Sequence, residues 1–121
     1  MRFDNISVGI DIESVERFRG KSLESDSTFL NLIFTSKELE YCFSKSISEQ
    51  HLCGRFCAKE AIVKALTPLD ITDVVYNEIE ILNTEKGYPT ARIEKYPNID
   101  IKLSISHNKD YATANAIVIK E

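Results

Sequence analysis

Two acidic residues stand in segments whose remaining pattern is apolar, and both offer hard oxygen ligands. Asp11 lies in the alternating segment 6–12, although aspartate is disfavoured in β-strands. It shares a face with Gly9, and a glycine within a strand lets another backbone or a ligand approach closely. Glu60 lies in the largely apolar segment 48–66. Two such carboxylates would suit Mg²⁺, which typically takes one or two carboxylates with waters and substrate phosphates, provided that the two segments meet.

Four of the charged residues in segment 48–66 form two separate stripes. At about 100° per residue, Glu60 and Lys64 lie on one side of a helix, and Arg55 and Lys59 lie on another. The remaining residues are apolar nearly all round, so the helix should be largely buried, where an unpaired charge costs several kcal/mol. Two explanations stay open. One is an i,i+4 ion pair between Glu60 and Lys64, worth about 0.2–0.5 kcal/mol on an exposed helix; the other is a bound metal ion or phosphate.

The histidines and cysteines give weaker signals. His107 ends the segment 101–107 just before a turn, and sites are often built at strand ends, but a lone histidine there is more often a surface residue. Cys53 and Cys57 lie close to His51 in the same helical segment. A zinc site usually needs a CxxC spacing and a further ligand. We therefore interpret both thiols as buried packing groups.

Hydrophobic periodicity predicts the elements that must position these side chains in the first half of the chain. Segment 6–12 alternates as a half-buried strand does. Residues 13–19 indicate a short helix that ends at a glycine. Thr35 stands three residues before Glu38, which is the spacing of a capping box. The longest helix is expected over 48–66, ending before a proline.

The second half changes character and is rich in β-branched and aromatic residues. Turn residues separate four expected strands, at 74–82, 89–96, 101–107 and 111–119. One strand, then helices, then a run of strands indicates an α+β fold in which an antiparallel sheet packs against one long helix plus short helices. With 121 residues, we expect a single domain over 1–121.

Composition excludes several classes of protein. Lys and Arg total 15 against 19 Asp and Glu, and a net charge of −4 argues against a nucleic-acid partner. No stretch approaches the ~18 apolar residues of a membrane helix. The first residues carry Asp4 and lack a long apolar run, so we expect no signal peptide. Three cysteines without a secretory signal favour the reducing cytoplasm.

Three motifs together resemble the holo-acyl-carrier-protein synthase type of 4′-phosphopantetheinyl transferase. They are Gly-Ile-Asp-Ile at 9–12, Gly-Arg-Phe-Cys-Ala-Lys-Glu-Ala at 54–61 with Lys-Ala-Leu at 64–66, and Ser-Ile-Ser-His-Asn-Lys-Asp-Tyr-Ala at 104–112. The resemblance runs over about residues 6–119. It implies the fold of that family and a homotrimer that binds coenzyme A between subunits. It also implies Mg²⁺-dependent transfer of 4′-phosphopantetheine from coenzyme A to a serine of an apo acyl carrier protein, with release of adenosine 3′,5′-bisphosphate.

The resemblance also implies roles for single residues. Asp11 and Glu60 match the Mg²⁺ ligands. Lys64 matches a residue that contacts the phosphates and stabilises the leaving group. His107 matches a residue that contacts a coenzyme A phosphate from the other side of the cleft, and Arg55 would bind another phosphate. Glu60, Lys64 and His107 are thus the expected catalytic residues, with Glu60 or a metal-bound water accepting the serine proton.

A basic cluster and two departures from the family complete the expectations. Arg17, Arg19 and Lys21 would dock the acidic carrier protein, with Arg17 as the matching residue; the alternative is a solvated helix end whose cations complement the helix dipole. Residues 67–70 read Thr-Pro-Leu-Asp where the family has a glycine-rich turn, and residues 87–89 lack the usual lysine. The first departure motivates an alternative function, a non-catalytic module that binds coenzyme A or a carrier protein.

Overall fold

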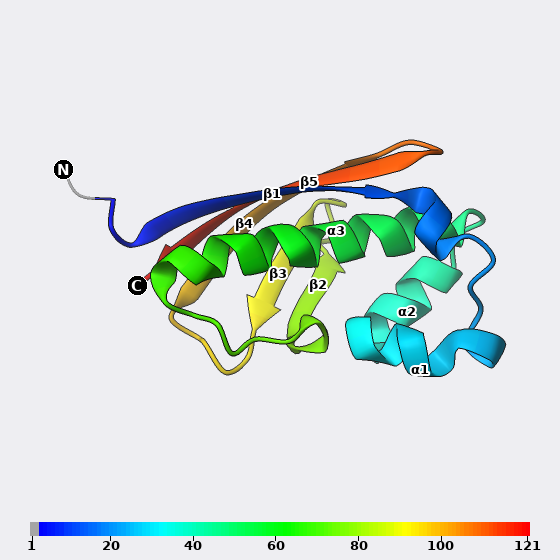
Figure 1. The fold of residues 1–121 in the computed structure, drawn as a ribbon, viewed down its shortest axis with the longest axis horizontal. Coiled ribbons are helices and arrows are strands. Elements are labelled where there is room, and N and C mark those ends of the chain that lie inside the picture. Colours follow the sequence, from blue (N-terminus) through cyan, green and yellow to red (C-terminus); the bar gives the residue numbers. More distant parts are fainter. Residues whose placement is uncertain (1–2) are drawn as a thin grey trace.

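The computed structural model describes residues 3–121, and these form a three-stranded sheet, a two-stranded hairpin and three helices (Figure 1). In chain order the elements are β1 (Ile6–Ser14), α1 (Leu23–Ile33), α2 (Ser36–Phe43), α3 (Ser48–Leu66), β2 (Ile79–Asn83), β3 (Pro89–Ile93), β4 (Ile99–His107) and β5 (Tyr111–Lys120). The sheet has the antiparallel order β1-β5-β4, and β2 pairs with β3. Within residues 3–121, no helix has the length and apolar character that a membrane crossing requires.

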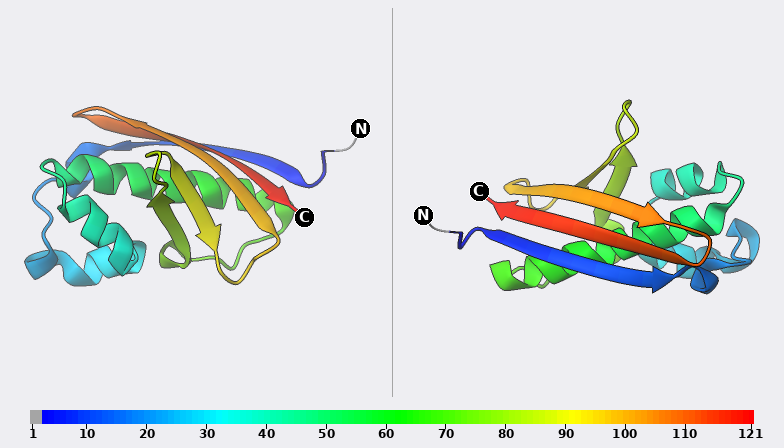
Figure 2. Two further views of the ribbon diagram at one scale, coloured as in Figure 1. Left: turned by 180° about the vertical axis from the view of Figure 1, so that it is seen from behind. Right: turned by 90° about the horizontal axis from the view of Figure 1, so that it is seen from above.

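Helix α3 lies along one face of the three-stranded sheet, while α1 and α2 lie together near the N-terminal end of α3 (Figures 1 and 2). Helix α3 runs over the residues that the sequence predicts, and it ends before Pro68 because proline cannot continue the helical hydrogen bonding. Most of its length is buried, as expected from its apolar circumference. The predicted capping box at the start of α2 is also present, since Thr35 and Glu38 exchange side-chain and backbone hydrogen bonds. These elements confirm the α+β class.

Strand β1 approaches α3 unusually closely at Gly9. A Cβ atom at this position would overlap the backbone carbonyl of Ala61 on α3. Glycine therefore serves the purpose that its place in a strand pattern indicates, the close approach of a second backbone. Because side chains alternate along β1, Asp11 faces the helix on the same side as Gly9.

The other face of β1 carries large apolar side chains and lies open to solvent. Val8, Ile10 and Ile12 are 69%, 62% and 66% exposed. The alternation of segment 6–12 thus correctly predicts a strand with one buried face, but the small and polar residues are on the buried side. The reason is the close contact with α3, which leaves no room for larger side chains there.

One of the two charged stripes of α3 has a structural partner. Lys59 is fully buried and its Nζ donates to Glu38 Oε1 at 2.6 Å. The same ammonium donates to the carbonyl oxygens of Ile33 and Tyr76, at 2.7 and 2.9 Å. Glu38 Oε2 accepts from the amide of Ile81 at 2.8 Å. This network ties α1, α2, α3 and β2 together, so Lys59 needs no ligand to explain its burial.

The region after β1 differs from the expected elements. Strand β1 continues to Ser14 because its last residues pair with β5, and only Val15–Phe18 form a short 3₁₀ helix instead of the helix expected over 13–19. Helix α1 has no counterpart among the expected elements. Its start is capped by Ser22, whose hydroxyl accepts from the amide of Ser25 at 3.2 Å.

The strand expected over 74–82 was predicted too early. Tyr76–Glu78 form a 3₁₀ turn, and β2 begins only at Ile79. The Glu78 carboxylate accepts from the amide of Val75 at 2.9 Å, which satisfies this backbone group locally and leaves it unavailable to a sheet.

Candidate functional site

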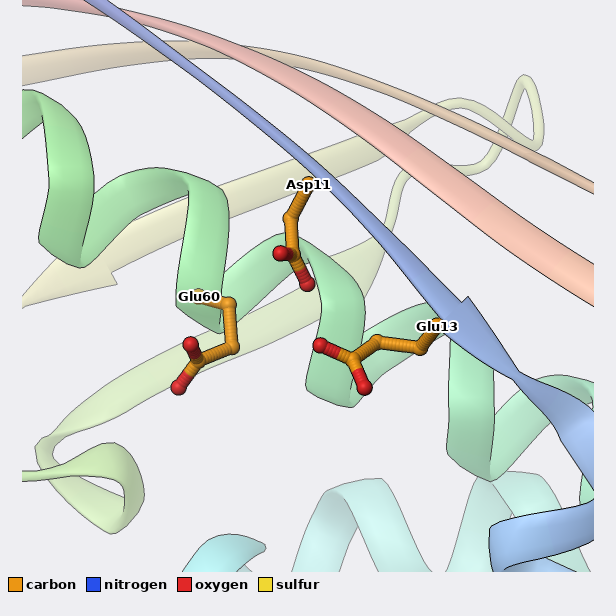
Figure 3. Close-up of side chains that lie close together, drawn as sticks. All are labelled: Asp11, Glu13 and Glu60. Carbon is orange, nitrogen blue, oxygen red and sulfur yellow. The ribbon is translucent and has the colours of Figure 1, made fainter.

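Three carboxylates converge in the space between β1 and α3 (Figure 3). Asp11 and Glu13 extend from β1, and Glu60 extends from α3; one oxygen of each lies within 4.8 Å of the others. Residues 11 and 13 share a face because side chains alternate along a strand. The close packing of β1 on α3 at Gly9 brings that face to Glu60. We call Asp11, Glu13 and Glu60 the acid cluster.

The acid cluster has the properties of a site for a hard divalent cation. Asp11 Oδ2 is buried and has no hydrogen-bond partner among residues 3–121. Burial, followed by the neighbouring Asp11, raises the pKa of Glu13 to about 7. Crowded carboxylates of this kind are stabilised by a cation that shares their oxygens. The residues present therefore fit Mg²⁺, which prefers carboxylate oxygen ligands.

Lys64 belongs to this site, but its partner is not the one that helical spacing suggests. Its Nζ donates to Asp11 Oδ1 and to the carbonyl oxygen of Ile10, both at 3.1 Å. Glu60 instead accepts a hydrogen bond from the Tyr76 hydroxyl. Of the two explanations that the sequence leaves open for this stripe, the i,i+4 pair is therefore wrong. The acids and Lys64 form one polar group across two elements.

A second polar group lies on the other flank of α3, around a cleft of about 200 Å³. Arg55 lines this cleft, is 5% exposed, and donates from Nη2 to Asn83 Oδ1 at 2.7 Å. Its guanidinium lies 4.0 Å from the centre of the Tyr41 ring. His107 and His51 also line the cleft, with ring centres 5.2 Å apart. We call this the histidine cleft.

The two groups are separated by α3. Glu13 and His107 both lie opposite Ala112 of β5, on the two neighbouring strands, so their backbones are about 10 Å apart. Cys57 of α3 lies over this point, since its thiol donates to the Ala112 carbonyl at 3.5 Å. Within one chain, the structure thus brings Asp11, Glu60 and Lys64 together and places Arg55 and His107 around a different cleft.

The basic cluster lies directly after β1, and each of its cations has an acidic neighbour. Arg17 is 3.3 Å from Glu13 of the acid cluster and stacks over Phe56 at 4.7 Å. Arg19 pairs with Glu16 and also donates to the carbonyl of Lys109 at 2.8 Å. Lys21 lies 3.8 Å from Asp26. Arg17 is therefore the member of the cluster that touches the candidate site.

Sequence reasoning missed two residues of the site. Glu13 falls in the segment expected to form a short helix, although extending the alternation of segment 6–12 by one residue places it on the same face as Asp11. Tyr76 gave no signal, because its contact with Glu60 depends on how the chain folds back after α3. Cys53 and Cys57 are free, buried thiols, which confirms their interpretation as packing groups. Burial raises the pKa of Cys53 to about 11.

The turn after α3 keeps a left-handed residue without glycine. Thr67–Leu69 form a 3₁₀ turn, and Asp70 follows with φ 61° and ψ 30°. Aspartate tolerates this region better than most residues because its short side chain can hydrogen-bond locally. The replacement of the glycine-rich turn therefore does not prevent the chain from turning here.

Comparisons with known proteins point to one family. A family model described as the 4′-phosphopantetheinyl transferase superfamily matches residues 7–116. A holo-[acyl-carrier-protein] synthase of Thermoanaerobacter sp. (strain X514) is 44% identical over 120 residues, covering 93% of this chain and 86% of that protein. One of Clostridium tetani is 36% identical over 121 residues, covering 93% of this chain and 94% of that protein.

Solved structures agree with the sequence comparisons. The holo-(acyl-carrier-protein) synthase of Bacillus anthracis, in complex with CoA (3′,5′-ADP), matches with a TM-score of 0.78 and 28% identity, covering 95% of this chain and 96% of that one. The Helicobacter pylori holo-[acyl-carrier-protein] synthase, in complex with coenzyme A, matches with a TM-score of 0.75 and 28% identity, covering 94% of this chain and 99% of that one.

Proposed function

Since the chain belongs to the 4′-phosphopantetheinyl transferase superfamily, as the motifs at 9–12, 54–66 and 104–112 indicate, we propose that it transfers 4′-phosphopantetheine from coenzyme A to a serine of an apo acyl carrier protein. The reaction depends on Mg²⁺ and releases adenosine 3′,5′-bisphosphate. The expected family, fold class and transferase class are confirmed. The observation that supports the chemistry is the acid cluster, in which one buried Asp11 oxygen has no hydrogen-bond partner in the described part of the chain.

Attack of a serine hydroxyl on a diphosphate must overcome repulsion by the phosphates and charge on the leaving group. Asp11 and Glu60 would hold Mg²⁺, and Glu13 adds a third carboxylate within reach. When bound, the ion neutralises charge on the diphosphate. Lys64 supplies a further positive charge beside the same carboxylates, where it can stabilise the leaving phosphate. Glu60 is the proposed acceptor of the serine proton.

Coenzyme A would also be bound through the histidine cleft. Arg55 and His107 offer charged and hydrogen-bonding groups for a phosphate, and Arg55 is held in place by Asn83 and Tyr41. Because α3 separates this cleft from the acid cluster of the same chain, one subunit presents two partial sites. A neighbouring subunit that brings its histidine cleft to the acid cluster would complete a single site.

The outward face of β1 supports an assembly of subunits, for which the family resemblance implies a homotrimer. Its exposed apolar row lies on an edge strand next to the acid cluster. A depression of about 420 Å³ at this edge is lined by Ile10, Asp11, Ile12, Lys64 and Thr113. Exposed apolar rows of this kind usually mark interaction surfaces. A second subunit bound on β1 would bury the apolar row and enclose the open side of the depression.

The acidic carrier protein would dock on Arg17, Arg19 and Lys21. Arg17 supports this role because it contacts Glu13, so a carrier held there lies beside the acid cluster. Cations at such a surface mainly raise the rate of association with an acidic partner.

The proposed activity is tested by incubating the protein with coenzyme A, Mg²⁺ and each apo acyl carrier protein of the same cell, and measuring the intact carrier mass. We expect the mass of one phosphopantetheine group to be added to a carrier. Asp11→Asn and Glu60→Gln should abolish the transfer while the protein stays folded. Asp100→Asn, which changes a partly exposed acid of β4, is the matched control and should retain it. An unmodified carrier in every reaction would contradict the proposal.

A further inference from the structure

The two histidines of the chain lie against each other in the histidine cleft. His51 comes from the first turn of α3 and His107 from the end of β4, and their rings meet at an angle of 69°. Gly54 allows β4 to come this near, because a Cβ there would lie 3.2 Å from Ile105 Cγ2 and 3.8 Å from His107 Cδ2. The pair is therefore built into the contact between helix and sheet.

The charged groups that shift the pKa of His51 are cations when ionised. Arg55 lies one turn further along α3 on the same side, Lys45 lies in the loop before α3, and His107 faces it from β4. The Tyr41 ring also contacts His51, with its centre 5.7 Å from that of the imidazole. Burial, followed by His107, Arg55 and Lys45, lowers the pKa of His51. The surroundings of His51 in the free protein therefore disfavour its protonated form.

The described lining of the cleft offers no negative charge to balance Arg55. None of the described residues that line it is acidic. Arg55 is nine-tenths buried, and its Nε has no hydrogen-bond partner among residues 3–121. A buried, incompletely paired guanidinium beside two imidazoles is suited to an anion with several acceptor oxygens, such as a phosphate group.

We propose that His51 is a second imidazole ligand of the phosphate that this cleft takes, and that it binds in its protonated form, so that coenzyme A binding is coupled to the uptake of a proton. The inference rests on the proposed function, which assigns a coenzyme A phosphate to Arg55 and His107. The bound phosphate supplies negative charge beside His51. This charge stabilises the protonated imidazole and so raises the pKa of His51. Binding of coenzyme A is then tighter at mildly acidic pH than at alkaline pH.

The test uses the fact that the untagged chain has two histidines, whose imidazole Cε1–H groups give two signals in ¹H–¹³C spectra. The signal of His51 is assigned by its loss in His51→Gln, and both are titrated with pH with and without coenzyme A. We expect coenzyme A to raise the pKa of His51 by about one unit, equivalent to a roughly tenfold preference of the ligand for the protonated form. Calorimetry in two buffers of different ionisation enthalpy should show proton uptake that His51→Gln loses and Gln50→Ala retains.

The outcomes separate this inference from the proposed function. If coenzyme A binds but the pKa of His51 stays unchanged, His51 is not a phosphate ligand, and the transferase proposal is unaffected. If calorimetry shows no binding of coenzyme A to the wild type, the proposed function itself fails. Should His51→Gln not fold, the wild-type titration still decides, with the signal of His107 assigned in His107→Gln.

Discussion

At the scale of single residues, Glu13 makes the acid cluster sensitive to pH. Burial, with Asp11 second, raises its pKa from 4.5 to about 7. The folded carboxyl therefore keeps a proton that the unfolded chain has lost, and this contribution to stability is complete below about pH 4.5 and lost as the pH rises towards about 7. In the presence of a chelator, we expect the free energy of unfolding by urea to decrease over this range. Glu13→Gln should remove that component of the decrease.

The control for this prediction is Glu16→Gln, because Glu16 is exposed and lies just beyond the acid cluster. It should retain the wild-type slope of unfolding free energy against pH. If Glu13→Gln keeps the wild-type slope, the proton taken up over this pH range belongs to another group. Because the protein is metal-free in this measurement, the result reports the burial and close approach of the acids without any contribution from a bound cation.

At the scale of elements, the position of Asp11 depends on the contact between β1 and α3. Gly9→Ala places a methyl group where the Ala61 carbonyl lies, so the strand must move away from the helix. Overpacking of this kind typically costs about 1–3 kcal/mol. We expect a lower melting temperature together with weaker binding of Mn²⁺ used as a probe, measured by calorimetry. Ser7→Ala, two residues earlier on the same buried face, should leave metal binding intact; wild-type metal binding in Gly9→Ala would contradict the argument.

The buried ion pair is the second contact that holds the elements together. Glu38→Gln removes the charge that balances Lys59, and breaking such a pair typically costs about 3–5 kcal/mol because the remaining charge stays buried. Urea unfolding should show this loss. Glu40→Gln, an exposed acid of the same helix, should change stability little. A cost for Glu38→Gln as small as that of Glu40→Gln would mean that the ammonium finds other partners.

The sequence predicts those elements whose pattern is local. Helix α3 is found between the expected residues because its continuous apolar run and the following proline are features of the local sequence. The capping box of α2 is likewise a contact over three residues. The 3₁₀ turn Tyr76–Glu78 is not predicted, because the alternation around it resembles a strand. Its backbone is instead engaged by Glu78 and by Lys59 of α3.

The candidate site is predictable to the extent that its residues break a pattern. Asp11, Glu60 and Lys64 are unusual in apolar segments, so sequence alone singles them out, and the structure brings them together. Glu13 and Tyr76 follow no unusual pattern, and only the register of β1 and the path after α3 reveal them. The sequence also does not predict which face of β1 is buried, since alternation distinguishes two faces without saying which of them packs against the helix.

At the scale of the whole molecule, the proposed function predicts that activity requires assembly, because the acid cluster and the histidine cleft lie on either side of α3. Ile10 is 62% exposed at the centre of the apolar row and also lines the depression beside the acid cluster. Ile10→Glu would bury a carboxylate in the proposed interface, which is strongly unfavourable without a partner. We expect sedimentation analysis to show trimers for the wild type and monomers for Ile10→Glu, with unchanged circular dichroism and loss of transfer. Leu32→Glu, at an exposed leucine of α1, should stay trimeric. A trimeric Ile10→Glu would mean that the interface lies away from this face of β1. A fully active monomer would mean that one chain completes the site by itself.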